Sequence, residues 1–308
     1  MRIFEEVSFS TRPVVLASWP GMGNVGLITV DYLRRELGAI PFAEIDMSPY
    51  FIPESIVVKD GIAQFPDIPS SKLYYHRNPN LIIFESNAQF GGKDGILIIK
   101  MLLDLLADLD VKEIFTFAAF SLPMSFEDRS EVLVTCNNTR MFSKISSLGL
   151  APMPDGYIAG MNGLLLGVAA SRGLDAACLL GTIPNYAANL HYPKASLEIL
   201  EKISHFLSIQ PDTAELQASI DETEQQFESI EERIREFFPS VDKENDLEIS
   251  EIHEDKVPHF VMDRIERLFQ EAIKDIKAAS ELKKELDRWN LFELYEDRFL
   301  DLFEDRKI

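Results

Sequence analysis

Cysteine is scarce in this chain. Cys136 and Cys178 are its only two cysteines among 308 residues, and both lie in apolar runs typical of strands. Buried cysteines act as small hydrophobic residues, and a fold stapled by disulfides would need more of them. We therefore expect reduced, buried thiols, which fits a cytoplasmic protein.

Long apolar runs are missing as well. No stretch approaches the length of a membrane helix, and the first six residues lack the apolar core of a signal peptide. Basic residues are outnumbered, with 30 Lys and Arg against 51 Asp and Glu and a formal net charge of −21. We expect a soluble protein whose partners include no nucleic acid and no membrane.

Motifs of metal and nucleophile chemistry are absent too. The five histidines show no H-x-x-x-H spacing, and there is no G-x-S-x-G, no G-x-x-x-x-G-K-[ST] and no C-x-x-C. The sequence therefore predicts no metal and no cofactor, and it favours a non-catalytic protein over an enzyme.

A glycine-dense turn, Gly21 to Gly26, is the most informative stretch. It follows the apolar run Val14 to Ala17, which suits a buried strand, and precedes apolar residues at helical spacing that end near Gly38. The start of a helix leaves N–H groups unpaired and carries a partial positive charge, so it attracts anions. The pattern predicts a strand, a turn with a candidate anion site, and a helix.

The same turn matches G-x-G-x-x-G, and Glu44 or Asp46 lies about 20 residues on, where a dinucleotide-binding fold places its ribose-binding acid. Glycine turns also join strands to helices for purely steric reasons, and Pro20 would stiffen the approach of a dinucleotide. Both interpretations are open from these residues alone.

The first 208 residues alternate between helical and strand-like patterns joined by short links. The near-continuous apolar run 113–119, for example, follows a helical pattern that begins at Gly95. This alternation predicts a three-layer α/β/α sandwich with a mixed, mostly parallel sheet. Between residues 50 and 85, turn dipeptides such as Asp60-Gly61 predict antiparallel hairpins instead.

Ligands of such sheets usually bind beyond the carboxyl ends of the strands. Polar and glycine residues that follow predicted strands therefore form our candidate site, in which Glu85 is the single carboxylate and a weak candidate for acid–base catalysis. Turns and caps need the same residue types, so a structural role is the alternative. The candidate ligand-binding residues are Gly21, Met22, Gly23, Asn24, Glu85, Ser86, Asn137, Asn162, Gly163 and Thr182.

Charge divides the chain near residue 208. Residues 1–208 hold 22 acids and 16 bases, whereas residues 209–308 hold 29 acids and 14 bases. Apolar residues of the second segment recur at spacings of three and four, which predicts helices, and its last part is rich in aromatics that need burial. We therefore predict a core domain, 1–208, and an acidic helical extension, 209–308.

Two stretches taken together resemble a known family. They are Trp19 to Gly26 and Gly160 to Gly167, the latter continued by Arg172 to Ala176, Leu179 to Pro184 and Tyr192 to Ala195. This ordered series, over residues 10–208, closely resembles the archaeal and bacterial branch of the proteasome assembly chaperone family. The resemblance implies an α/β/α fold like that of purine nucleoside phosphorylases without their catalytic residues. It also accounts for the glycines of the turn without a dinucleotide.

The resemblance further implies self-association, with a trimer as the first expectation, and another protein complex as a partner. Family members that chaperone proteasome rings dock a C-terminal tail of a hydrophobic residue, Tyr and any residue, whereas Lys307 holds the tyrosine position here. We therefore expect a non-catalytic, assembly-chaperone-like interaction protein. The alternative is a small-molecule binder or enzyme with a nucleoside, phosphate or nucleotide ligand at the carboxyl ends of the strands.

Overall fold

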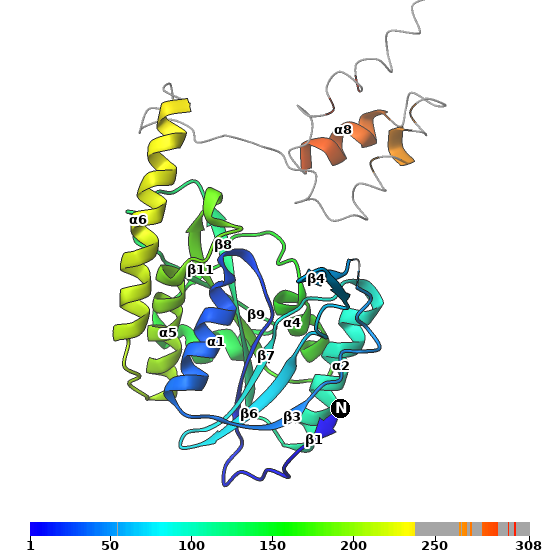
Figure 1. Cartoon of the computed structure of the whole chain (residues 1–308), viewed down its shortest axis with the longest axis vertical. Helices are drawn as coiled ribbons and strands as arrows, with labels where there is room; N and C mark the ends of the chain where they lie inside the picture. The colour runs from blue at the N-terminus through cyan, green and yellow to red at the C-terminus, as the bar shows by residue number, and fades with distance from the viewer. Residues whose placement is uncertain are drawn as a thin grey trace, which may run out of the picture. The chain divides into compact units, whose positions relative to one another are not determined.

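The computed structural model of the protein describes residues 1–53, 55–237, 265, 267–269, 272, 279–288, 295 and 299. Contacts divide the chain into two compact units, Met1–Pro239 and Ser240–Ile308. The first unit is built on one large sheet flanked by helices (Figure 1).

Within residues 1–53 and 55–237, nine strands form this sheet in the order β1-β3-β6-β7-β2-β8-β11-β9-β10. Its centre is parallel, because β7, β2, β8 and β11 all run the same way. On one side of this centre, β6 pairs with β7 as an antiparallel hairpin. On the other side, β9 runs antiparallel to β11. The central strands are β7 (Asn80–Ser86), β2 (Val14–Ser18), β8 (Glu113–Leu122) and β11 (Ala176–Pro184), and the outer ones are β1 (Arg2–Ile3), β3 (Ile40–Glu44), β6 (Ser71–Arg77), β9 (Val132–Cys136) and β10 (Ala151–Pro152).

Helices cover both faces of the sheet, and alternate side chains of β2 pack against the helices on opposite faces. Val14 and Leu16 pack in the core cluster beneath α1, α3 and α5, whereas Val15 and Ala17 pack in the opposite cluster with α2 and α4. These helices are α1 (Val25–Glu36), α2 (Gly92–Asp108), α3 (Thr139–Ile145), α4 (Met161–Ser171) and α5 (Pro193–Leu207). The predicted three-layer α/β/α sandwich with a mixed sheet is confirmed.

A further helix, α6 (Ala214–Phe237), packs on the outside of α5 and belongs to the first unit. Its apolar stripe, Leu216, Ile220 and Phe227, is buried. The division between the units therefore falls about thirty residues later than the change in charge at residue 208. The exposed face of α6 is acidic, whereas its buried apolar stripe packs on the core. The division into a core domain 1–208 and an extension 209–308 stays a prediction.

The second unit is described at fewer positions. Helix α8 (Ala279–Arg288) buries Ala279, Leu282 and Leu286, which is the three-and-four spacing that the sequence predicts. The rings of Phe269 and Tyr295 lie 5.7 Å apart between centroids, and Tyr295 and Phe299 are buried. The other aromatics predicted to need burial here, among them Trp289, Phe292 and Phe303, lie outside the described residues.

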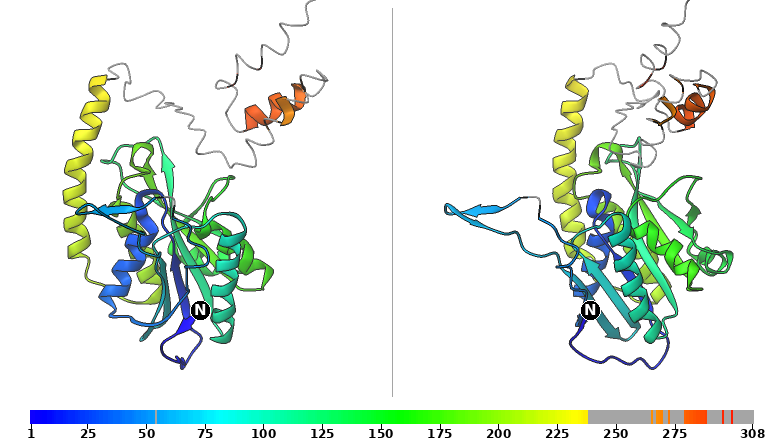
Figure 2. Two further views of the ribbon diagram at one scale, coloured as in Figure 1. Left: turned by 45° about the vertical axis from the view of Figure 1, so that its right-hand side comes forward. Right: turned by 90° about the vertical axis from the view of Figure 1, so that its right-hand side faces the viewer.

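A short two-stranded hairpin, β4 (Val57–Lys59) with β5 (Ile62–Gln64), stands outside the large sheet. Asp60 and Gly61 both adopt positive φ, as the predicted tight turn requires. The hairpin projects away from the body of the first unit (Figure 2). We call residues 55–68 the arm.

Candidate functional site

The glycine turn lies at the carboxyl end of β2, where the sequence placed it. Gly23 is buried with φ +65°, and a Cβ there would come within 3.1 Å of Tyr192 Cβ. A Cβ on Gly26 would stand 2.4 Å from the carbonyl oxygen of Phe117 and 2.5 Å from Ser18 Oγ. Backbone conformation and close packing of α1 against the sheet therefore require these glycines.

Two N–H groups of the turn already have protein partners. Gly23 N–H donates to the carbonyl of Ala188 at 2.9 Å, and Asn24 N–H donates to that of Gly21 at 3.0 Å. Tyr192 N–H in turn donates to the Gly23 carbonyl at 2.9 Å. The turn is thus tied to the segment that precedes α5, and an anion would have to displace these bonds.

Asn162 is the central side chain of this edge. Its Oδ1 accepts from Trp19 N–H at 3.0 Å, and its Nδ2 donates to the Trp19 carbonyl at 3.1 Å. It is only 3% exposed. Its neighbour Gly163 has no room for a Cβ, which would lie 2.6 Å from Ile158. These two candidate residues lie beside the glycine turn, where they hold backbone segments together.

Glu85 and Ser86 end the neighbouring strand β7. Glu85 accepts two hydrogen bonds from Arg34 Nε, at 2.8 and 3.0 Å, and the guanidinium of Arg34 lies over the ring of Tyr74, 4.9 Å from its centroid. Burial raises the pKa of Glu85, and the charge of Arg34 opposes that rise. Ser86 Oγ accepts a hydrogen bond from Ser71 at 2.8 Å. A carboxylate engaged in this way ties α1 to the sheet.

Two candidate residues, Thr182 and Asn137, hydrogen-bond to the backbone at the ends of the paired strands β9 and β11. Thr182 Oγ1 accepts from Glu131 N–H at 2.8 Å, just before β9 begins. Asn137 follows the end of β9, and its Oδ1 accepts from Ala176 N–H at the start of β11. Because β9 runs antiparallel to the central strands, Asn137 lies at the amino edge of the sheet, away from the glycine turn. It lines a separate cavity of about 300 Å³ with Asn138 and Arg140.

The structure therefore brings Gly21 to Asn24, Asn162 and Gly163 together and places Glu85 and Ser86 on the adjacent strand end. Asn137 is not brought to this edge. Ligand binding by these residues stays a prediction. Among the described residues, no group of three His, Cys, Asp or Glu side chains could hold a metal ion. Over the same part of the chain, no helix has the length and apolar character needed to cross a membrane.

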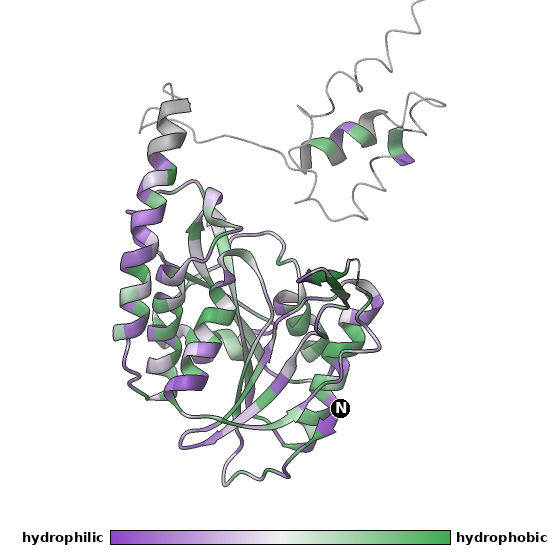
Figure 3. Cartoon of the chain, viewed as in Figure 1, coloured by the Kyte–Doolittle hydropathy of each residue, from purple (hydrophilic) through white to green (hydrophobic). Residues whose placement is uncertain are grey.

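The arm is a feature whose significance the sequence analysis missed. Both of its strands are exposed along their whole length, and they appear among the strongly hydrophobic segments in Figure 3. Six large apolar side chains of the arm are exposed: Ile56, Val57, Val58, Ile62, Phe65 and Ile68. The exposure of these strands was not predictable, because the continuous apolar run Ile56 to Val58 has the pattern of a buried strand.

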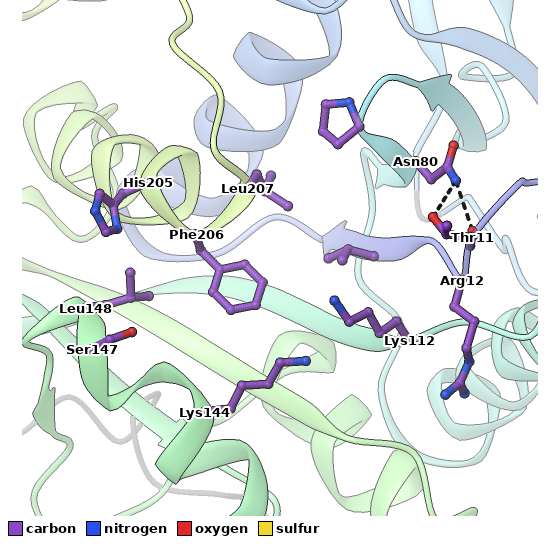
Figure 4. A pocket seen from close by; sticks show the side chains of 12 residues that line it. Thr11, Arg12, Asn80, Lys112, Lys144, Ser147, Leu148, His205, Phe206 and Leu207 are labelled. Atoms are coloured by element: carbon purple, nitrogen blue, oxygen red, sulfur yellow. Dashed lines mark hydrogen bonds between the residues drawn. The ribbon is translucent and has the colours of Figure 1, made fainter.

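A basic cavity is the second feature that was missed. It has a volume of about 470 Å³ and lies at the amino edge of the sheet, between the start of β2 and the end of α5 (Figure 4). Arg12, Lys112 and Lys144 are among the residues that line it. These three residues are far apart in the sequence, so their spacing does not indicate a shared site. The one available signal was that each lies near the end of a predicted strand or helix.

Comparison with solved structures shows the same fold in several proteins. PbaB of Pyrococcus furiosus, an archaeal proteasome activator, is similar with a TM-score of 0.64 and 23% identity, covering 74% of this chain and 97% of its own. PbaA of the same organism, a homologue of proteasome-assembly chaperones, reaches a TM-score of 0.61 at 23% identity over 77% of this chain and 93% of its own. A proteasome-assembly chaperone homologue of Mycobacterium tuberculosis reaches 0.58 at 18% identity over 75% and 97%.

Comparison with curated proteins finds no match. The sequence model of the PAC2 family matches residues 15–231, which include the glycine turn, the parallel centre of the sheet except Val14, and most of α6. The match to this family model and the similar folds of the solved structures both agree with the resemblance to proteasome assembly chaperones noted from the sequence. This chain therefore belongs to the PAC2 family.

Proposed function

We propose that this chain is a non-catalytic, self-associating protein of the assembly-chaperone type, which works in the cytoplasm and binds protein chains through its arm. The observation that carries the proposal is the arm itself. Its six exposed apolar side chains include Phe65, which is 79% exposed, and Val58 and Ile62, each 62% exposed. Contiguous apolar surface of this kind marks a protein interface, because monomeric proteins rarely leave it in contact with water.

The size of the arm supports this function. Together, its six apolar residues expose as much surface as more than three fully exposed residues of the same types. A standard interface buries about 800 Å² on each partner, so the arm supplies a large share of one. Its paired strands also leave their outer edges open to another strand, which gives backbone hydrogen bonds to a partner.

A second copy of the chain is the partner we propose first, with a trimer as the expected assembly. Residues 1–208 carry a net charge of −6, so two copies repel each other and the burial of apolar surface has to outweigh that repulsion. An apolar arm provides such a surface. PbaB and PbaA, described as a proteasome activator and a chaperone homologue, support a further protein complex as partner.

A catalytic role has less support. Glu85, the weak candidate for acid–base catalysis, is engaged by Arg34, and the amides of Gly23 and Asn24 bond to carbonyls of the protein. A nucleoside or phosphate ligand at the carboxyl edge would have to replace these contacts.

Analytical ultracentrifugation of the full chain tests the proposal. The double variant Ile62→Ser, Phe65→Ser should keep the circular dichroism spectrum and thermal midpoint of the wild type but sediment as a monomer. The matched control is Ile40→Ser, which changes an exposed apolar residue of β3 outside the arm. This control should keep the wild-type assembly. A wild-type chain that is monomeric at micromolar concentration contradicts self-association, and an arm variant that still assembles contradicts the role of the arm.

A further inference from the structure

The basic cavity lies at the amino edge of the sheet, opposite the glycine turn. Val14 and Asn80 stand at the starts of β2 and β7, Lys112 directly precedes β8, and Phe206 comes from the last turn of α5. Its volume of about 470 Å³ falls within the range of small-molecule sites, roughly 300–1,000 Å³.

The charge of this cavity is opposite to that of the chain. Among the twelve described residues that line it, Arg12, Lys112 and Lys144 are cationic and none is acidic. The chain as a whole has 51 acids and 30 bases. Arg12 is already engaged, because it donates to the carbonyl of Val111 at 2.8 Å and pairs with Asp110 at 3.1 Å. The two lysines are therefore the groups that matter.

Lys112 and Lys144 share one carboxylate. The Glu113 side chain is 1% exposed, and Lys144 Nζ donates to its Oε2. Lys112 Nζ lies 3.8 Å from Glu113 Oε1, which is too far for a hydrogen bond, and Oε1 has no hydrogen-bond partner among the described residues. Two ammonium groups with one carboxylate leave one positive charge at the wall of the cavity. At 3.8 Å from Glu113 Oε1, Lys112 Nζ makes no hydrogen bond to that oxygen and can donate to a ligand in the cavity.

An apolar surface adjoins this charge. The centroid of the Phe206 ring lies 5.9 Å from Lys144 Nζ, and Figure 4 shows the two lysine side chains reaching toward each other beside that ring. The carboxyl end of α5 would repel an anion, but its carbonyls at Ser204 and His205 accept hydrogen bonds from Ile209 and Ser208 N–H groups. Their negative character is thereby reduced.

We propose that this cavity binds a small organic oxyanion, a carboxylate or a phosphate monoester with a flat apolar part. Lys112, with Lys144, holds the oxyanion, and the ring of Phe206 contacts the apolar part. The site is independent of the arm and of self-association, since its residues lie outside residues 55–68.

Isothermal titration of the full chain with benzoate, phenyl phosphate and inorganic phosphate tests the site, with benzylamine as a cation of matching shape. At least one aromatic oxyanion should bind more tightly than inorganic phosphate, and benzylamine should not bind. The variant Lys112→Ala should weaken binding about tenfold, the loss expected for one charged contact. Benzoate and phenyl phosphate compared with each other distinguish a carboxylate from a phosphate ligand.

The matched control is Lys100→Ala, which removes an exposed lysine of α2 that does not line the cavity. It should leave the affinity unchanged. The proposal is overturned if no oxyanion binds at millimolar concentration, if benzylamine binds equally well, or if both lysine variants weaken binding alike, because the last result indicates general attraction of anions. The thermal midpoint of each variant without ligand verifies that it is folded.

Discussion

Asn162 and Trp19 exchange two hydrogen bonds across the carboxyl edge of the sheet, although 143 residues separate them in the sequence. The asparagine amide supplies one acceptor and one donor to a backbone segment that has no strand partner there. The start of α4 is thereby fixed to the end of β2, and the glycine turn is held between them.

The first prediction concerns this pair. Asn162→Ala leaves a buried donor and a buried acceptor of Trp19 without partners, which should lower the free energy of unfolding by about 2–4 kcal/mol. Urea denaturation measures the change. Asn189→Ala, at an exposed asparagine, serves as the control and should stay within about 0.5 kcal/mol. Equal stability of the two variants would refute a structural role for Asn162.

The second prediction compares the effect on stability of replacing a tightly packed glycine, Gly26, with that of replacing an unhindered one, Gly167. Gly26→Ala forces a methyl group against the Phe117 carbonyl, 2.4 Å away, and should destabilise the fold by about 1–3 kcal/mol. Gly167→Ala in α4 meets no described atom within 4 Å and should stabilise the helix by about 0.5–1 kcal/mol. Thermal unfolding of both variants should therefore shift in opposite directions, and shifts of the same sign contradict the packing described for the turn.

The third prediction tests whether α6 belongs to the core. Phe227 is 2% exposed and lies 5.4 Å from the ring of Tyr192 between centroids. Phe227→Ala should cost about 3–5 kcal/mol and open residues 209–213 to limited proteolysis. Glu222→Ala, on the exposed face of the same helix, should change neither property. If Phe227→Ala behaves like this control, α6 does not contribute to the stability of the first unit.

The fourth prediction concerns pH. Because burial raises the pKa of Glu85, the folded chain holds this proton to higher pH than the unfolded chain does. The contribution of Glu85 to stability is therefore largest below its ordinary pKa of about 4.3 and declines as pH rises through the raised value. Urea midpoints measured from pH 4 to pH 7 should fall for the wild type relative to Glu85→Gln. A rise over that interval would show that the ion pair with Arg34 outweighs burial.

Local patterns were enough to predict much of the fold. The strand before Gly21, the helix after it and the turn at Asp60-Gly61 all depend on residues that are neighbours in the sequence, where periodicity and turn chemistry act directly. The predicted layers followed from the alternation of these elements. The buried stripe of α8 that contains Leu282 and Leu286 follows in the same way from their spacing of four residues.

Features that depend on distant residues were not predictable in this way. The direction of β9 is invisible in its own apolar run, so Asn137 was assigned to the same edge as the glycine turn. The partner of Glu85 is Arg34, 51 residues away, and no local signal connects them. The packing of α6 on α5 was not predictable from its acidity, because net charge reports the exposed face of an amphipathic helix and not the buried one.

The position of β11 has a consequence for the way the chain is synthesised. This strand lies between β8 and β9 in the sheet, yet it is the last of the nine in sequence. While the ribosome is still translating residues before Ala176, the emerging β8 has no partner on one side, and its apolar surface is open to aggregation. The native order of strands can form only after Pro184 has left the exit tunnel, so β8 has no second partner strand while residues 123–175 are being translated.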